Sequence, residues 1–285
     1  IYDFEKIEEL KKYADCAETK TLLGKIKQQK KEKLVTLLTE KNVFRDKLGK
    51  PTKLFMPLSS DALFDVQIKR IHEYKRQLMN LLHLIMLYLE IRQNCNNKRI
   101  KRLVVIGGKA APGYENAKHI IHLTYILAKQ INQDPAVCDK LRLIFIENYN
   151  VSKTLVIIPA ADLSEQISLA GMEASGTGNM KMAINGALTI GTDDGANIEM
   201  RKAVGEKYWP FGFGMSAQEV EKLDDYNPYK VCESNTKIKE AIDYLNSTDL
   251  LADSSAANCL SHIRAMLLEK TATTHGDRYI VLQDL

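Results

Sequence analysis

Residues 173–181 (EASGTGNMK) combine a glycine-rich loop with a lysine, a pairing that could bind a phosphorylated cofactor. Two glycines flank Thr177, and Lys181 follows in the expected first turn of a helix over 180–187. Backbone N–H groups of such a loop attract anions, and a helix dipole adds to the attraction. A lysine can both pair with a phosphate and form a Schiff base with an aldehyde. Gly-Thr-Gly is also common in ordinary turns, so the loop alone leaves both interpretations open.

Two nucleotide-binding motifs do not fit this loop. The P-loop requires a lysine directly after its second glycine; Gly171 and Gly176 have the glycine spacing, but Thr177 follows them. The dinucleotide-binding fingerprint requires a third glycine three positions after the second, and Lys181 occupies that position. The loop therefore predicts neither kind of nucleotide site.

A second segment carries concentrated positive charge. Residues 69–76 (KRIHEYKR) hold four cations in eight residues, at an expected junction between a strand and a helix. Glu165 and Glu173 are separated by seven residues, a spacing found in many retaining glycosyltransferases. A cationic strand end that faces a phosphate-binding loop would hold two phosphates, or a phosphate and a developing sugar cation.

The elements that must position these segments follow from hydrophobic patterning, which predicts strands alternating with helices. The expected strands cover 63–71, 102–106, 141–146, 154–158 and 187–192. The expected helices cover 73–94, 115–131, 180–187 and a segment that starts at 159–162 with Asp162 and Glu165 in a capping box. Such alternation indicates an α/β fold with a doubly wound, mostly parallel sheet.

Ligands of such sheets bind at the carboxyl ends of the strands. Four loops are expected at those ends, namely 70–75, 107–114, 147–150 and 173–181. The cationic segment and the glycine-rich loop are both among them, so we expect them to share one site.

Composition indicates an ordinary globular protein, with 45% hydrophobic and 27% charged residues and a net charge of +4. A polar helix is expected over 5–41 and a loop over 42–60. We interpret the lysine-rich run 25–33 as a solvated helix face rather than a nucleic-acid site, because no aromatic residues interleave it. The longest apolar run, 78–91, is too short and too polar for a membrane span, so we expect no membrane contact.

Cysteine usage predicts reduced thiols and a cytoplasmic location. The five cysteines are far apart and form no C-x-x-C pair. His119 and His122 lie three positions apart on a helix without a third ligand in view, so we expect no metal. We interpret Asp193 and Asp194 as part of a turn. His72 is expected to position its neighbours.

Two further cations carry no predicted role. Lys109 lies in the glycine-rich turn 107–114, and Arg76 ends the cationic segment. We expect both to be surface charges.

Together, these segments resemble the glycogen/starch α-glucan phosphorylases. The blocks that carry the resemblance are 66–77 (VQIKRIHEYKRQ), 107–114 (GGKAAPGY), 158–168 (IPAADLSEQIS), 173–181 and 185–192 (NGALTIGT). The resemblance covers residues 1–214 closely and continues more weakly to the end of the chain. It implies a truncated, Rossmann-like C-terminal half of a two-domain glycosyltransferase-B-type fold.

The implied organisation has three parts. Residues 1–60 would be a helical lead-in with a connecting loop, 61–214 the cofactor-binding α/β core, and 215–285 a mostly helical and incomplete C-terminal part.

The resemblance also implies a covalent cofactor, pyridoxal 5′-phosphate, held as a Schiff base by Lys181. Thr177 and Gly178 match the loop that binds the cofactor's phosphate, and Lys69 matches a cation on that phosphate. Tyr149 matches a residue packed near the cofactor. Asn150 stands where some members of the family carry arginine.

Substrate contacts are implied in the same way. Arg70 and Lys75 match residues that bind inorganic phosphate, while Glu173, Ser175 and Gly176 match contacts to the glucosyl hydroxyls. Together, Lys69, Arg70 and Lys75 would lower the repulsion between the cofactor phosphate and the substrate phosphate. Tyr114 matches an aromatic residue at the mouth of the cleft.

The implied activity is phosphorolysis of an α-1,4-glucan from its non-reducing end to α-glucose 1-phosphate with retention, with the cofactor's 5′-phosphate as proton relay. Family members are far longer, are expected to form homodimers, and complete the cleft with an N-terminal half. We therefore expect this chain to be inactive alone.

Three other classes are weighed against this one. A pyridoxal phosphate enzyme acting on amino acids would need an acidic partner for the ring nitrogen and an arginine for the substrate, and neither can be identified. A nucleotide-sugar glycosyltransferase would have no use for Lys181 as a Schiff base. A non-catalytic carbohydrate-binding or scaffolding fragment stays open.

Overall fold

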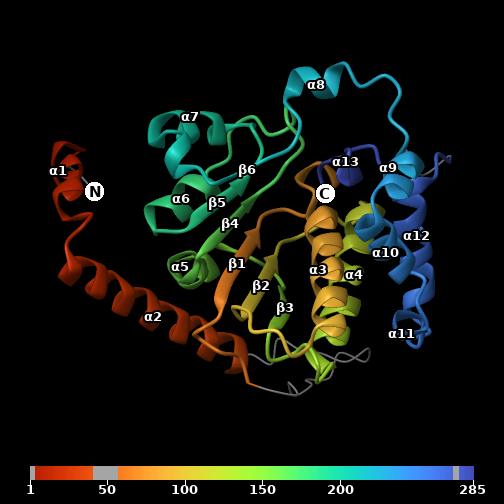
Figure 1. Ribbon diagram of the computed structural model, residues 1–285, viewed down its shortest axis with the longest axis horizontal. Helices are drawn as coiled ribbons and strands as arrows, with labels where there is room; N and C mark the ends of the chain where they lie inside the picture. Colours follow the sequence, from red (N-terminus) through yellow and green to blue (C-terminus); the bar gives the residue numbers. More distant parts are fainter. Residues whose placement is uncertain (1–3, 41–56, 272–275) are drawn as a thin grey trace.

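A computed structural model describes residues 4–40, 57–271 and 276–285, and a parallel sheet lies at its centre (Figure 1). Within the described residues the sheet has six strands in the order β3-β2-β1-β4-β5-β6, and every neighbouring pair is parallel. The strands are β1 (Leu63–Ile68), β2 (Arg102–Gly107), β3 (Leu141–Ile146), β4 (Leu163–Gln166), β5 (Leu188–Gly191) and β6 (Phe211–Gly212). The prediction of a doubly wound, parallel α/β sheet is confirmed.

The order of the strands creates a switch point between β1 and β4. From β1 the chain winds outward through β2 to β3, then returns to β4 and winds the other way through β5 to β6. Loops that leave the carboxyl ends of β1 and β4 therefore run apart, and ligands of open α/β sheets bind in the crevice between such loops.

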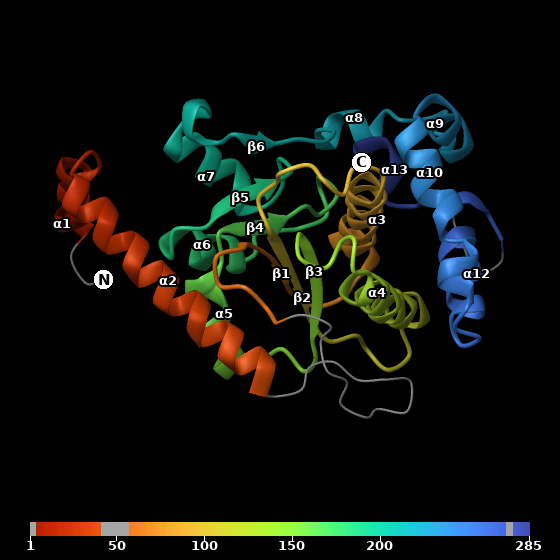
Figure 2. The same cartoon turned by 60° about the horizontal axis from the view of Figure 1, so that its bottom comes forward.

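Helices cover both faces of the sheet, as two views of the ribbon show (Figures 1 and 2). One face is covered by α3 (Gln77–Gln93) and α4 (Glu115–Gln133), and the other by α2 (Ala17–Glu40) and α5 (Val151–Ala160). Near the edge formed by β5 and β6 lie α6 (Gly178–Ile184), α7 (Ala196–Val204) and a short 3-10 helix, η3 (Glu206–Tyr208).

The chain after β6 is helical in its described part and adds an outer layer. The α-helices are α8 (Ala217–Glu221), α9 (Pro228–Ser234), α10 (Thr236–Tyr244), α11 (Thr248–Leu251), α12 (Ala256–Leu268) and α13 (Val281–Asp284). Helix α10 packs on α3 and α12 packs on α4. Buried residues of this layer, such as Ile263 and Leu282, belong to the same hydrophobic cluster as Leu82 and Val104, so the outer helices share the core of the sheet.

The N-terminal elements are a short helix α1 (Phe4–Glu8), a 3-10 turn η1 (Glu9–Tyr13) and the long α2. Leu34 and Leu38 of α2 are buried in a second cluster with Phe64 and Val66 of β1. The loop expected over 42–60 lies outside the described residues up to position 56. Among the described helices, none has the length and apolar character needed to cross a bilayer.

Two predicted elements are wrong, and they adjoin each other. Residues 154–158 form part of helix α5 instead of a strand, and the segment after Asp162 is strand β4 instead of a helix. Asn150 caps α5 by accepting a hydrogen bond from the backbone N–H of Lys153 at 3.2 Å. The β-branched run packs one helical face, since Ile157 and Ile158 are buried while Val151 and Leu155 are exposed. Tertiary packing outweighs β propensity here.

The predicted capping box at Asp162 does not form. Its carboxylate accepts a hydrogen bond from the backbone N–H of Phe64 at 2.7 Å and pairs with Lys31 at 2.6 Å. The lysine-rich run 25–33 was expected to be a solvated face of this helix, and this expectation is wrong for two of its lysines. Lys31 is buried, and half-buried Lys27 donates hydrogen bonds to three backbone carbonyls.

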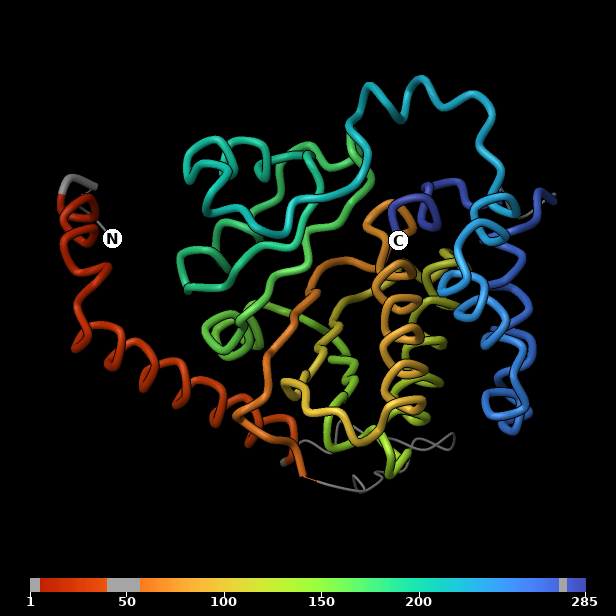
Figure 3. Tube along the Cα trace, in the orientation of Figure 1, coloured from red at the N-terminus to blue at the C-terminus, as the bar shows by residue number. Residues whose placement is uncertain are grey.

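Arg76, expected at the surface, is fully buried. It stands between a 3-10 turn, η2 (Glu73–Lys75), and α3, with a left-handed backbone at φ 53°. Its guanidinium donates to the carbonyl of Ile167 at 2.8 Å and forms an ion pair with Asp284 at 2.7 Å. Figure 3 shows how the C-terminal end of the chain returns to lie beside the start of α3. A contact between positions 208 residues apart gives no local signal in the sequence.

Candidate active site

A cavity of about 460 Å³ opens at the carboxyl ends of β1 and β4, where the strand order reverses. Its volume is in the range of small-molecule sites. The site residues expected from the sequence that line it are Lys69, Lys75, Tyr149, Glu173, Ser175, Gly176, Thr177, Gly178 and Lys181. The structure therefore brings the cationic segment and the glycine-rich loop to one cavity.

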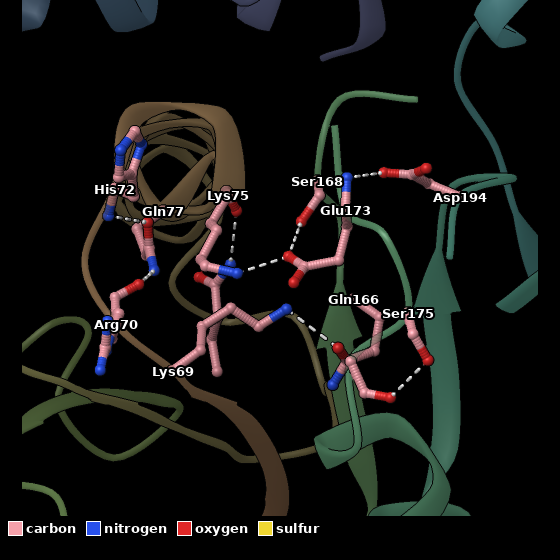
Figure 4. A network of polar contacts seen from close by, with 12 residues as sticks. Lys69, Arg70, His72, Lys75, Gln77, Gln166, Ser168, Glu173, Ser175 and Asp194 are labelled. Atoms are coloured by element: carbon pink, nitrogen blue, oxygen red, sulfur yellow. Dashed lines mark hydrogen bonds and ion pairs between the residues drawn. The ribbon is translucent and has the colours of Figure 1, made fainter. Parts of the chain in front are cut away.

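Lys69 and Lys75 enter the cavity from the segment after β1. Lys69 directly follows the strand, and its ammonium group donates to Oε1 of Gln166, at the end of β4, at 2.9 Å (Figure 4). The backbone of this segment packs tightly on the loop after β2, because a Cβ at Gly108 would lie 2.2 Å from the carbonyl oxygen of Lys69. Glycine at position 108 thus permits the approach that fixes Lys69.

Glu173 faces these cations from the opposite loop. Its Oε2 lies 2.5 Å from Nζ of Lys75 and accepts a hydrogen bond from the hydroxyl of Ser168 at 3.0 Å (Figure 4). Burial alone would raise the pKa of Glu173, but the hydrogen bond and charge of Lys75, with help from Lys69, hold that pKa below its ordinary value. The carboxylate is therefore an anionic acceptor in the wall of the cavity.

Burial has the opposite consequence for Lys69. Removal from water, with a smaller contribution from the charge of Lys75, lowers the pKa of Lys69 to about 8, while the charge of Glu173 opposes this shift. Because this pKa lies close to neutral pH, a modest rise in pH deprotonates a large fraction of the Lys69 ammonium groups. An anion bound beside it would favour the charged form.

The glycine-rich loop ends in helix α6, whose seven residues make only a short dipole. Lys181 is exposed on this helix, and its ammonium group lies 3.4 Å from the hydroxyl of Thr177. Gly176 takes a left-handed backbone at φ 79°. The loop thus offers a primary amine and a glycine backbone to the same cavity.

Tyr149 and Asn150 form a further wall after β3. The Tyr149 hydroxyl accepts a hydrogen bond from Thr154 at 2.9 Å, and Asn150 is committed to capping α5. An asparagine at position 150 therefore has a structural role that an arginine side chain could not perform.

Arg70 is the expected site residue that does not line the cavity. Its side chain is exposed, its carbonyl accepts a hydrogen bond from Gln77 at 3.0 Å, and its guanidinium group points away from the Lys75–Glu173 pair (Figure 4). His72 and Tyr114 also lie outside the lining and pack edge to face with ring centroids 4.7 Å apart.

Glu165 and Glu173 do not share the cavity. Glu165 is buried behind it, next to Asp65 of β1. Burial, followed by the charge of Asp65, raises the pKa of Glu165 well above its ordinary value. Of the E-x7-E pair, Glu173 alone lines the cavity, and Glu165 is part of a buried pair of carboxyl groups.

The cavity also has polar lining residues that the sequence does not identify as site residues, among them Gln166, Ser168, Asp194 and Asn197. Gln166 and Ser168 lie within a block that was recognised, but nothing local indicates which of its residues point into the cavity. Asp194 and Asn197 belong to the sequence DDGAN over 193–197, which was interpreted as a turn. An Asp-Gly pair directly after an expected strand is the sequence signal that could have identified them.

The sequence matches the family model described as carbohydrate phosphorylase over residues 1–285. It is 47% identical over 249 residues to the muscle form of glycogen phosphorylase from Mus musculus and 46% identical to that of Homo sapiens. It is 45% identical to glycogen phosphorylase from Synechocystis sp.. Each alignment covers 87% of this chain and 28% of the relative. The chain thus spans well under a third of the length of these curated relatives.

Proposed function

Because the chain belongs to the carbohydrate phosphorylase family, we propose that the full-length protein is an α-1,4-glucan phosphorylase. It would cleave glycogen- or starch-type glucans at the non-reducing end and release α-glucose 1-phosphate with retained configuration. One observation carries the proposal: a single cavity combines two lysines, an anionic acceptor and an exposed lysine beside a glycine-rich loop.

The residues present fit pyridoxal 5′-phosphate. The cavity of about 460 Å³ has Lys181 at its edge for covalent attachment, and Thr177 and Gly178 beside it for the phosphate. Lys69, which is partly withdrawn from water, would pair with that phosphate. Tyr149 would form the apolar wall. When bound, the cofactor would supply a phosphate that exchanges a proton with the substrate phosphate.

The protein's own residues would bring two polyanions close together. Lys69 and Lys75 lie on one segment and both line the cavity, so they would place positive charge near the two phosphates and lower their repulsion. Arg70 is proposed as a further ligand of the substrate phosphate, and it would need a different side-chain conformation to reach the cavity.

Sugar recognition is assigned to the opposite loop. Glu173 is ionised and is held by Lys75 and Ser168, so it can accept hydrogen bonds from glucosyl hydroxyls without changing its position. Ser175 and Gly176 would add contacts from the same loop. The substrate phosphate would then protonate the glycosidic oxygen and attack the anomeric carbon from the same face.

Several properties of the whole protein belong to this proposal. The rest of the chain would complete the cleft, the full-length enzyme would be a cytoplasmic homodimer, and the 285 residues alone would be inactive. Phosphorolysis of glycogen by the isolated 285-residue chain would contradict the last point.

Borohydride reduction followed by peptide mapping tests the assignment of the cofactor lysine. After reconstitution with pyridoxal phosphate, the pyridoxyl label is expected on Lys181, and Lys181→Ala should abolish it. Lys109→Ala is the matched control, because Lys109 is an exposed lysine outside the cavity. Absence of label in the unsubstituted protein would leave a scaffold or a nucleotide-sugar glycosyltransferase as the better description.

A further inference from the structure

The turn after β5 is bound to the loop that carries Glu173. The two carboxylate oxygens of Asp194 each accept a backbone hydrogen bond from this loop, one from Gly171 at 3.0 Å and one from Glu173 at 2.6 Å. Figure 4 shows the bond to Glu173. Asp194 is 8% exposed. A buried carboxylate that accepts two amides forms charge-assisted bonds, which are stronger than those between neutral groups.

The two residues after Asp194 extend the contact along the same loop. The backbone N–H of Ala196 donates to the carbonyl of Ser175 at 3.0 Å. Gly195 has φ +50°, and a Cβ there would lie 2.6 Å from the carbonyl oxygen of Ser175 and 2.9 Å from that of Glu173. The loop and the turn are therefore in backbone contact, and this contact requires glycine at position 195.

Asn197 connects the turn to the other parts of the site. Its side-chain amide donates to the carbonyls of Gln166 at 3.0 Å and Thr192 at 3.1 Å, and its oxygen accepts from Asn179 at 2.9 Å. Gln166 is the partner of Lys69, and Asn179 lies in the first turn of α6. Residues 194–197 thus contact both sides of the cavity. One side is the loop that carries Glu173, assigned to the sugar, and the other is formed by Gln166 and α6 near Lys69 and Lys181, assigned to the phosphate.

We propose that Asp194 is a positioning residue for sugar recognition, acting through the backbone of Glu173, with Gly195, Ala196 and Asn197 as its support. The proposal rests on the proposed function for the identity of the sugar ligand. Asp194 holds the N–H of Glu173 while Lys75 and Ser168 hold its carboxylate, so both ends of the residue are fixed. Preorganisation of an acceptor lowers the entropy lost when the ligand binds.

Asp194→Asn in the full-length protein is the informative variant. The amide keeps the shape of the side chain, but its NH₂ group must face one of the two backbone N–H groups, so one bond is lost. Asp193→Asn is the matched control, since it removes the same charge from the same turn. Asp193 contacts Arg201 on the exposed side at 2.7 Å, and Arg201 keeps Glu206 as a second partner.

The first measurement is backbone hydrogen exchange of peptides that cover residues 169–176. We expect exchange about tenfold faster in Asp194→Asn, in line with the loss of a hydrogen bond to a charged group, and no change in Asp193→Asn. Gly195→Ala is a second variant that displaces the loop while leaving the buried charge in place. The same acceleration is expected in that variant.

The second measurement compares equilibrium affinities for D-glucose and for inorganic phosphate. Asp194→Asn should weaken glucose binding about tenfold and leave phosphate binding within about twofold. A general loss of structure would weaken both. Unchanged exchange in both variants, or equal loss of glucose and phosphate affinity, would overturn the proposal.

Borohydride labelling of Lys181 in the same samples separates this proposal from the proposed function. If the label is present and the exchange is unchanged, Asp194 is not a positioning residue. If the label is absent from every sample while exchange rises in Asp194→Asn, Asp194 does position the backbone of Glu173. The proposed function would then be wrong, and with it the assignment of the ligand as a sugar.

Discussion

Lys69 shows how a single residue depends on its surroundings. An ammonium group in water has a pKa near 10.4, but burial at the end of β1 lowers the pKa of Lys69 to about 8. The charge that an anion would meet is therefore present at neutral pH and is lost within the mildly alkaline range.

A pH dependence of anion binding follows from this pKa. Below pH 8 Lys69 is protonated and attracts an anion, and above pH 8 it is increasingly neutral, so affinity should fall as pH rises. One pH unit above the pKa the loss should be about tenfold for a ligand that binds only the protonated form. Sulfate titrated calorimetrically into cofactor-free protein between pH 7 and 9 is a suitable probe, because sulfate itself does not titrate there.

The control replaces Lys69 with arginine. A guanidinium stays charged throughout this range, so Lys69→Arg should bind sulfate with an affinity that is nearly independent of pH. If the variant shows the same decline as the unsubstituted protein, another group is responsible for it.

At the scale of elements, α2 is held to the sheet by lysines that the sequence pattern places on a solvated face. The ammonium group of Lys27 donates to the carbonyls of Ala161 at 2.7 Å, Asn185 at 2.9 Å and Pro159 at 3.2 Å. These carbonyls lie at or just beyond the C-terminal ends of α5 and α6, where backbone carbonyls lack partners within the helix. Lys27 thus joins three helices.

Lys27→Met should destabilise the protein by about 1–3 kcal/mol, because partly buried carbonyls lose their donor while the apolar stem is retained. Lys30→Met removes the same charge from an exposed position of the same helix and should change stability by at most about 0.5 kcal/mol. Urea unfolding midpoints measure both. Equal effects of the two substitutions would show that the stability depends on the net charge of the helix and not on the hydrogen bonds of Lys27.

At the scale of the whole molecule, the ion pair between Arg76 and Asp284 joins the C-terminal segment to the site. Arg76 directly follows Lys75, and Asp284 also accepts a hydrogen bond from the backbone N–H of Met215 at 3.1 Å. Both side chains are almost completely buried. The return of the chain end thereby fixes the bend that carries Lys75 into the cavity.

Arg76→Met should cost about 3–5 kcal/mol, because it leaves the buried carboxylate of Asp284 without its cation. The double variant Arg76→Met/Asp284→Leu should cost clearly less than the sum of the single variants, since the second change removes the uncompensated charge. Chemical denaturation of the four proteins completes the cycle. Strictly additive effects would contradict a coupled pair.

Much of the fold could be predicted from the sequence because its elements have local causes. Apolar runs such as 102–106 and 141–146 are strands buried between helices, and the alternation of strands and helices leads to a parallel sheet. The errors lie at 154–162, where a β-branched run forms α5 and an apparent helix cap becomes an ion pair with Lys31. Both errors arise from packing against α2, which lies far from 154–162 in the sequence.

By itself, the sequence determined the chemistry of the site: a lysine near a glycine-rich loop, a cationic segment and a carboxylate, all after strands that end at one edge. The tertiary structure alone decided which side chains meet there. Lys69 and Arg70 are adjacent in the bend that follows β1, yet Lys69 lines the cavity and Arg70 faces away from it. Asp194, Gln166 and Ser168 line the site because distant loops pack together, and Asp284, near the end of the chain, binds Arg76 next to Lys75.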